Sequence, residues 1–217
     1  MPSTRYPRPS ERDDFGRVMY FTDAVFAIAM TLLVVEIGVP ETIEGAPDDP
    51  AALLGAFADK GHLIFAFFLG CYVIGLYWAA HHRFMSWLEA VDRGFVILTV
   101  AYLAFVALLP FPTGVLGEFG QNPISVVAFA LNMGAVSGME AVLFSHAQRR
   151  RLFREELPSD VYRWALGSSL LPVVAFALSI PVAFARPWLA IAMWFLSIPL
   201  QRAWARYRPA AASRYLA

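Results

Sequence analysis

Long blocks of apolar residues, separated by short stretches rich in charges or proline, divide this sequence. A bilayer-spanning helix needs about 20 such residues at a rise of about 1.5 Å each. The last apolar block covers 164–200 and would be about 55 Å long as one helix, so we expect it to turn back at Ala185-Arg186-Pro187. The pattern therefore predicts six spans, at about 17–37, 55–80, 94–112, 123–145, 164–184 and 187–204.

These spans define one membrane domain at 15–208, between an N-terminal tail at 1–14 and a C-terminal tail at 209–217. The predicted fold class is an all-α membrane protein with six transmembrane helices per subunit. We do not expect a cleaved signal peptide, because Asp23 interrupts the flank of the first apolar block and no small-x-small site follows it.

The composition supports a bilayer location. Apolar residues make up 59% of the chain and charged residues 16%, and the mean hydropathy is +0.56. The alternative, a soluble protein with a large buried helical core, fits this composition less well. Cys71 is the single cysteine of the sequence, which excludes an internal disulfide.

Basic residues lie almost entirely on one side of the predicted spans. Of the 17 lysines and arginines, all but Lys60 and Arg186 fall at the N-terminus or after spans two, four and six. Because cytoplasmic segments carry the excess of positive charge, we expect a multi-pass protein of the cell (inner) membrane with both termini in the cytoplasm. The opposite side is acidic, with Glu41, Glu44, Asp48, Asp49, Asp59 and Glu118.

One face of the first span carries small and branched apolar side chains and a single hydroxyl, that of Thr31. At 100° per residue, this ladder lies within about 60° of Ile28, whereas Asp23 falls about 140° away. Its members are Ala24, Ile28, Thr31, Leu32 and Val35. Periodicity alone leaves two interpretations open: a stripe that packs on helices or lipid, and the wall of a pore.

A second group is polar and is shared by the start of the first span and the end of the second. Its members are Arg17, Thr22, Asp23, Trp78, His81 and His82. We favour a hydrogen-bonded clamp between the two helices over a proton relay or hydrolytic site, because no nucleophile joins the group. Neighbouring histidines diverge by 100° on a helix and lack the i, i+4 spacing of a metal site, so we expect no bound metal.

Polar residues of the fourth span have structural interpretations. We expect Glu140 to pair with the arginines at 149–151, and Asn132 and Ser137 to bond between helices. Gly134-x-x-x-Gly138 is a possible close-packing face. The sequence has no P-loop, dinucleotide-binding, zinc-ligand or Gly-x-Ser-x-Gly pattern. We therefore predict no enzyme activity, no cofactor and no nucleic-acid partner.

Three motifs carry a resemblance to a known family. Arg17-x-x-x-Phe-Thr-Asp23 resembles the Arg-x-x-x-Phe-Ser-Asp signature that opens the first helix of the transmembrane protein 175 family of potassium channels. Trp78-Ala-Ala-His-His82 and Leu109-Pro-Phe-Pro-Thr113 are similar to the segments that close the second and third helices of that family. The one departure is Thr22 in place of serine, which keeps the hydroxyl.

This resemblance implies a homotetramer in which the first helix of each subunit lines a central pore. It implies a potassium-selective channel, weakly selective over other monovalent cations, without a Thr-Val-Gly-Tyr-Gly filter, which is absent here. The implied constriction is Ile28, with Thr31 contributing to selectivity, Val35 as a further apolar ring, and Ala24 and Leu32 as possible lining residues. Potassium ions would bind only transiently near Ile28 and Thr31, and the six polar residues above would form a hydrogen-bond network.

Two other functions stay open on the sequence. A secondary or proton-coupled membrane transporter is the main alternative, and it would show saturating flux coupled to an ion gradient. A membrane scaffold without transport is the third. The predicted partners are potassium ions, the lipid bilayer and three further copies of the chain.

Overall fold

The protein is built almost entirely of α-helices. The structure, a computed structural model, describes residues 11–40 and 49–215. Its helices are α1 (Glu11–Leu32), α2 (Pro50–Asp59), α3 (Gly61–Ser86), α4 (Arg93–Leu108), α5 (Pro110–Glu118), α6 (Pro123–Arg150), α7 (Ser159–Ala185), α8 (Pro187–Ala205) and α9 (Ala212–Tyr215). This architecture confirms the all-α membrane fold.

Five spans in the described residues are long and apolar enough to cross a membrane. They are Phe15–Leu32, Gly61–Ser86, Arg93–Glu118, Pro123–Arg150 and Ser159–Ala185. The predicted sixth span corresponds to α8, a 19-residue helix that packs against α7 but is not among these five. The count of six spans therefore stays a prediction.

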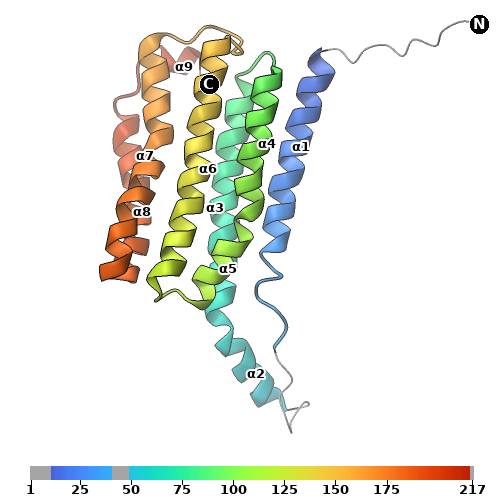
Figure 1. Cartoon of the computed structure of the whole chain (residues 1–217), viewed down its shortest axis with the longest axis vertical. Coiled ribbons are helices and arrows are strands. Elements are labelled where there is room, and N and C mark those ends of the chain that lie inside the picture. Colours follow the sequence, from blue (N-terminus) through green and yellow to red (C-terminus); the bar gives the residue numbers. More distant parts are fainter. Residues whose placement is uncertain (1–10, 41–48, 216–217) are drawn as a thin grey trace, which may run out of the picture.

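Helix α1 stands at one side of the bundle and α7 and α8 stand at the other, with α3, α4 and α6 between them (Figure 1). Helix α6 packs against α4, α5, α7 and α8, and half of its span is buried. Only 17% of the α1 span is buried, although α1 contacts α3, α4 and α5. A peripheral helix with one packed face leaves its other face available to a partner or to lipid.

The boundaries of α1 differ from those predicted. The helix begins at Glu11, inside the predicted tail, and ends at Leu32 instead of residue 37. From Val34 to Gly38 the backbone makes i to i+3 hydrogen bonds of 3.1–3.4 Å, such as Val35 N to Leu32 O, and Gly38 has a φ of 61°. Tightening of this kind is common at helix ends. Residues 1–10 of the predicted tail, and residues 41–48 of the predicted acidic loop, lie outside the described residues.

Two other predicted spans contain breaks. Lys60 separates α2 from α3, so the second span begins at Gly61 rather than near residue 55. Pro110 lies at the start of α5, directly after α4, and its fixed φ and missing N–H suit the first turn of a helix. The segment that resembles the close of the third helix, Leu109 to Thr113, therefore contains the start of a new helix that continues the span to Glu118.

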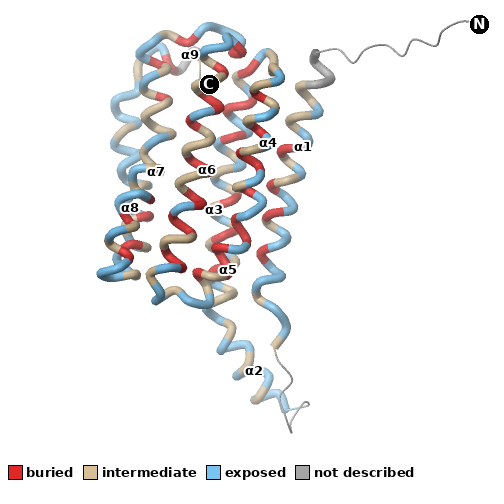
Figure 2. The backbone as a smooth tube through the Cα atoms, viewed as in Figure 1, coloured by how far each residue is buried: buried red, intermediate tan, exposed pale blue. Residues whose placement is uncertain are grey.

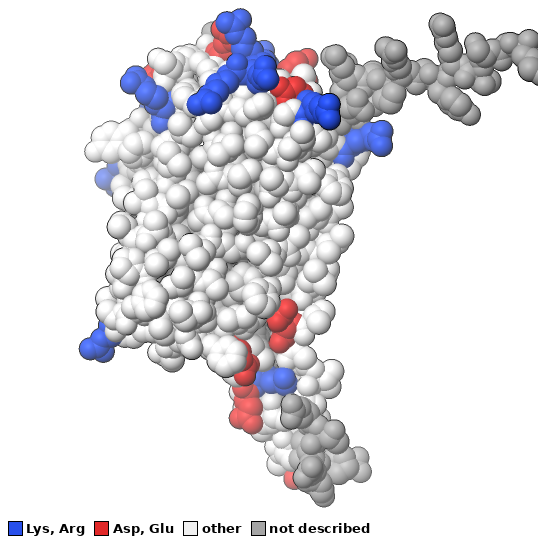
Figure 3. All heavy atoms as spheres, viewed as in Figure 1, with Lys and Arg blue, Asp and Glu red and all other residues white. Residues whose placement is uncertain are grey.

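The loops at one end of the bundle pair with each other. A single antiparallel bridge joins Leu88 to Phe153, and the Glu89 amide donates to Leu152 O at 2.9 Å. Lysines and arginines gather over this end on the face shown in Figure 3, and a band without charged residues separates them from the acidic side chains at the opposite end. This distribution matches the asymmetry of the sequence.

Gly70 allows a close contact between helices, whereas Gly134 and Gly138 have space around them. A Cβ at Gly70 on α3 would lie 2.9 Å from Leu33 Cδ1 and 3.0 Å from Thr113 Cγ2, so α1, α3 and α5 meet there. A Cβ at Gly138 would meet nothing within 4 Å, and one at Gly134 would lie 4.0 Å from Phe176 Cβ. Within one chain, therefore, neither glycine of this possible packing face is needed for a close helix contact.

Candidate functional site

Helix α1 has a packed face and an unpacked face. Thr22, Phe26, Ala29 and Leu33 are buried and recur at the three- and four-residue spacing of one helical face. Figure 2 shows these buried positions alternating with exposed ones along the helix. The packed face fixes the rotation of α1 and thereby decides which side chains point away from the bundle.

The unpacked face carries the predicted ladder. Ala24, Thr31 and Leu32 are exposed, Ile28 is 57% exposed, and Val35 is exposed in the turn after α1. Val35 was expected to continue the helical face, but the helix ends at Leu32, so its direction is set by the turn. Within one subunit, nothing in the described residues covers this apolar strip.

Thr31 places the hydroxyl of the ladder one turn from Ile28. The Thr31 hydroxyl donates to the Ile28 carbonyl oxygen at 2.8 Å. A hydroxyl has one hydrogen and two lone pairs. Because this bond uses the hydrogen, the oxygen can still accept a hydrogen bond or coordinate a cation. The arrangement places one available oxygen beside the apolar Ile28 side chain.

Asp23 connects α1 to α3 through an indole. Trp78 Nε1 donates to Asp23 Oδ1 at 2.8 Å, and His82 Nδ1 lies 3.9 Å from the same oxygen. The Trp78 and His82 rings lie 5.4 Å apart, as expected for residues one turn apart on a helix. These three residues of the predicted network therefore lie together at the edge of the bundle.

The other histidine of the pair faces the core. His81 is 1% exposed, stacks on the Tyr102 ring at 4.7 Å and contacts Phe26 of α1. Its Nδ1 donates to Glu140 Oε2 at 2.9 Å. The expected single network is therefore divided, because neighbouring helical positions diverge by 100° and send His81 and His82 to different partners.

The remaining members of the predicted network do not join Asp23. The Thr22 hydroxyl donates to the Val18 carbonyl at 2.9 Å. Outside that network, the amide of Asn132 bonds to α4 and the hydroxyl of Ser137 bonds to α3. Arg17 is exposed, and no ion pair joins it to any side chain that the structure describes. The interhelical roles expected for Asn132 and Ser137 are confirmed.

The expected pairing of Glu140 with the arginines at 149–151 is wrong. Glu140 pairs with His81, whereas Arg150 Nε lies 3.6 Å from Asp92 and Arg151 Nε lies 3.1 Å from Glu156. The arginines lie more than two turns further along α6, beyond the reach of the Glu140 side chain. Sequence spacing could not reveal the His81 partner, which is 59 residues away on another helix.

Asp92 forms a second charged cluster outside the spans. Its Oδ1 accepts from the Phe95 amide at 2.6 Å and from His146 Nε2 at 2.9 Å. Burial alone would raise the pKa of Asp92, but these hydrogen bonds and the charges of His146 and Arg150 outweigh it and lower that pKa. In the sequence, the only indication of this cluster is Asp92 itself, an acidic residue at a position that can cap the start of α4.

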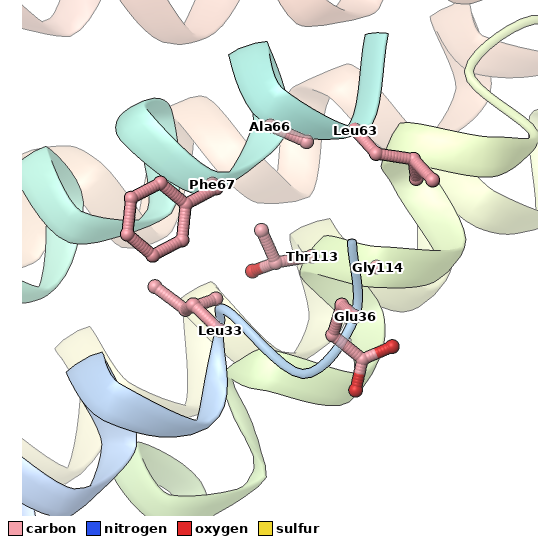
Figure 4. Close-up of a pocket in the computed structure, with 7 residues that line it drawn as sticks. All are labelled: Leu33, Glu36, Leu63, Ala66, Phe67, Thr113 and Gly114. Carbon is pink, nitrogen blue, oxygen red and sulfur yellow. The ribbon is translucent and has the colours of Figure 1, made fainter. Parts of the chain in front are cut away.

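At the other end of α1, Glu36 lies against α5. Figure 4 shows Glu36 next to Gly114, in a small pocket that Leu33, Leu63 and Thr113 also line. A Cβ at position 114 would collide with the Glu36 carboxylate. Glycine therefore permits an acidic side chain to lie close to the exposed end of the ladder.

Among the described residues, no group of three or more histidine, cysteine or acidic side chains could hold a metal ion.

Comparison with known proteins gives consistent matches. Residues 17–110 match the family described as the endosomal/lysosomal potassium channel TMEM175. A potassium channel of Streptomyces collinus is 30% identical over 190 residues, covering 83% of this chain and 87% of the relative. The endosomal/lysosomal proton channel TMEM175 of Gallus gallus is 30% identical over 134 residues, which is 60% of this chain and 26% of the relative.

A solved structure has the same fold. The crystal structure of a lysosomal potassium-selective channel TMEM175 homolog from Chamaesiphon minutus matches with a TM-score of 0.71 and 25% sequence identity. The match covers 90% of this chain and 99% of that one. The helical arrangement described above is therefore shared almost end to end with a channel subunit.

Proposed function

Because the chain belongs to the TMEM175 family, we propose that it is a potassium channel in which α1 lines the pore. Four copies surround one axis, and each contributes its unpacked α1 face. The channel prefers potassium weakly over other monovalent cations. Neither an enzyme activity nor a bound cofactor is part of this proposal.

The exposed ladder on a peripheral helix is the observation that carries the proposal. Ile28 is 57% exposed and Leu32 is 44% exposed, although the opposite face of α1 is buried in the bundle. Contiguous apolar surface on one face requires lipid or protein to cover it. A membrane-facing stripe needs no hydroxyl, whereas a pore wall gains a cation ligand from Thr31.

Ile28 is the proposed constriction. Four isoleucine side chains around an axis form a narrow apolar ring that hydrated ions cannot pass without losing water and gaining no ligand. Thr31, one turn away, supplies four oxygens that replace part of the hydration shell of a potassium ion. Val35 adds an apolar ring near the mouth, and Ala24 and Leu32 line the wall.

The contact between Asp23 and α3 is the proposed support for this wall. Trp78 and His82 hold the Asp23 carboxylate on the side of α1 away from the ladder. Buried Thr22 and His81 support α1 from the core, and exposed Arg17 joins Asp23 only in the assembled channel. These residues orient α1 and do not contact the permeating ion.

We place both termini in the cytoplasm of a cell with this protein in its inner membrane. The arginine-rich end of the bundle supports this orientation. After Cys71 is replaced by alanine, a cysteine at Glu118 should react with an impermeant maleimide in intact cells, and a cysteine at Arg150 should not. Labelling at position 150 would overturn the orientation.

Flux through liposomes of purified protein tests the function. The proposal predicts potassium flux that is linear in the driving force and resolves into single-channel steps in a bilayer. Saturating flux that follows a second ion gradient would support a secondary or proton-coupled transporter instead. Proton conduction is measured in the same vesicles, because the Gallus gallus relative is named a proton channel.

A further inference from the structure

A cavity lies away from α1. It has a volume of about 390 Å³ and is bounded by α3, α6, α7 and α8. This volume falls within the range of about 300–1,000 Å³ of small-molecule pockets in proteins. Since no residue of α1 lines it, the cavity belongs to each subunit and not to the proposed pore.

The two ends of the cavity differ in chemistry. One end is aromatic, where Trp194 stacks on Phe129 at 4.9 Å and lies 5.6 Å from Phe176. The other end is polar and is lined by Glu140, Ser137, Ser168, Ser169, Gln201 and Arg83. Apolar walls with a few polar groups at one end are typical of a site for an amphiphilic small molecule.

Two hydrogen-bond acceptors at the polar end have unused capacity. The Glu140 carboxylate uses one oxygen for His81 at 2.9 Å, and an ionised carboxylate can accept several further bonds. Pro172 lines the cavity from within α7, and its missing N–H leaves the carbonyl of Ser168, four residues earlier, without a helical donor. That carbonyl lies on the same side of α7 as the proline ring.

The charged side chain that is largely buried at this end is the Glu140 carboxylate. The carboxylate of Glu140 is 14% exposed, and the His81 behind it is closed off from the cavity by burial. Arg83 is exposed at the mouth, and no ion pair within the described part of the chain joins it to Glu140. The rings of Trp194 and Phe176 at the other end offer apolar surface to the body of such a ligand.

We propose that this cavity binds a monovalent organic ammonium ion, with its nitrogen at Glu140 and the Ser168 carbonyl and its apolar body against Trp194. An organic ammonium fits better than a metal ion, because most of the lining offers no oxygen to replace a hydration shell. The ligand enters from the membrane or from the cytoplasmic end, independently of the pore.

Three probes of the same shape and different charge test the site. 1-Adamantylamine, 1-adamantanol and 1-adamantanecarboxylate are titrated by calorimetry into the purified full-length assembly at pH 7, with empty micelles as the blank. The amine should bind once per chain and at least tenfold more tightly than the alcohol, and the carboxylate should bind most weakly. Equal affinities of the three probes would show that the cavity is only an apolar void. Tightest binding of the carboxylate would show that the cavity binds anions such as lipid headgroups. Either result overturns the proposal.

Variants locate the binding. Glu140→Gln keeps the shape and an acceptor for His81, so it should abolish the tenfold preference while the alcohol still binds. Ser169→Phe should fill the cavity and remove binding of all three probes, which keeps the test decisive if Glu140→Gln fails to fold. Thr31→Val, at the proposed pore, should leave amine binding unchanged. Loss of amine binding in Thr31→Val, or its persistence in Ser169→Phe, would contradict the assignment.

Discussion

The Trp78 indole on α3 donates a hydrogen bond of 2.8 Å to the Asp23 carboxylate on α1, on the side of α1 that faces away from Ile28. One polar contact and one buried apolar face therefore fix the rotation of the helix that carries the exposed ladder. If α1 turned by one residue, about 100°, Asp23 would leave Trp78 and Ile28 would leave the proposed axis.

Removing either partner of this contact should loosen α1. Asp23→Ala and Trp78→Phe should each lower the yield of assembled channel, by an equilibrium effect of about 1 kcal/mol per chain, because the site is partly exposed. Asp23→Asn keeps an oxygen that accepts from the indole and should assemble better than Asp23→Ala. Size-exclusion chromatography measures the yield. An Asp23→Ala channel that assembles fully and has altered ion preference would make Asp23 a permeation residue.

The two neighbouring histidines should respond very differently to the same substitution. His81→Ala leaves Glu140 without its hydrogen-bond partner in the core, and an unsatisfied buried group costs about 1–3 kcal/mol, with more for a charged one. His82→Ala removes a side chain that is 46% exposed, a class of contact worth about 0–1 kcal/mol. Thermal unfolding in detergent compares the two. Equal stability of both variants would contradict the buried role of His81.

Asp92 should make the stability of the loop end depend on pH. Its pKa is lowered in the folded state, so its contribution is fully present above the unfolded value of about 3.9 and is lost as the pH falls through the folded value. Asp92→Asn retains a capping side chain but not the charge, so this part of the acid dependence should disappear. Asp92→Ala also loses the capping side chain, so its free energy of unfolding should be about 1 kcal/mol lower than that of Asp92→Asn at every pH. Denaturant unfolding at pH 3–6 checks this; an unchanged slope in Asp92→Asn would assign the dependence to other acids.

Thr31 should affect selectivity without affecting assembly. Thr31→Val keeps the shape of the side chain and removes the oxygen that is free to accept a cation. The ratio of potassium to sodium permeability, taken from reversal potentials, should fall toward one. Thr31→Ser restores the oxygen and should restore the ratio. Reversal potentials that do not move in Thr31→Val would locate selectivity elsewhere.

Much of the fold could be predicted, because long apolar blocks indicate membrane spans and prolines indicate helix breaks without knowledge of tertiary contacts. The spans at α6 and α7 agree with the predicted bounds within about five residues at each end, whereas both ends of the second span, Gly61 and Ser86, differ from the predicted 55 and 80. The end of α1 could not be predicted, because the apolar pattern continues through Val35 although the backbone tightens after Leu32. Likewise, the proline at 110 signals a break, but only packing decides that the span continues as α5.

The candidate site was partly accessible from sequence for the same reason. Spacing along α1 identified the ladder, and equal depth in the membrane suggested that Asp23 lies near Trp78. The pairing of His81 with Glu140 depends on how α3 and α6 are rotated about their axes, which is set by tertiary packing. The pattern of apolar and polar residues along one helix cannot predict this pairing.

The most direct test of the pore is the conductance of Ile28→Asn. An amide at the constriction should wet an apolar ring, so potassium leak should rise and selectivity should weaken relative to wild type at matched yield of assembled protein. Ile97→Asn is the control, since Ile97 is another isoleucine with similar exposure, 60% against 57%, but lies on α4. It should leave the current unchanged. If liposome flux through Ile28→Asn is unchanged or reduced while assembly is preserved, α1 does not line the pore.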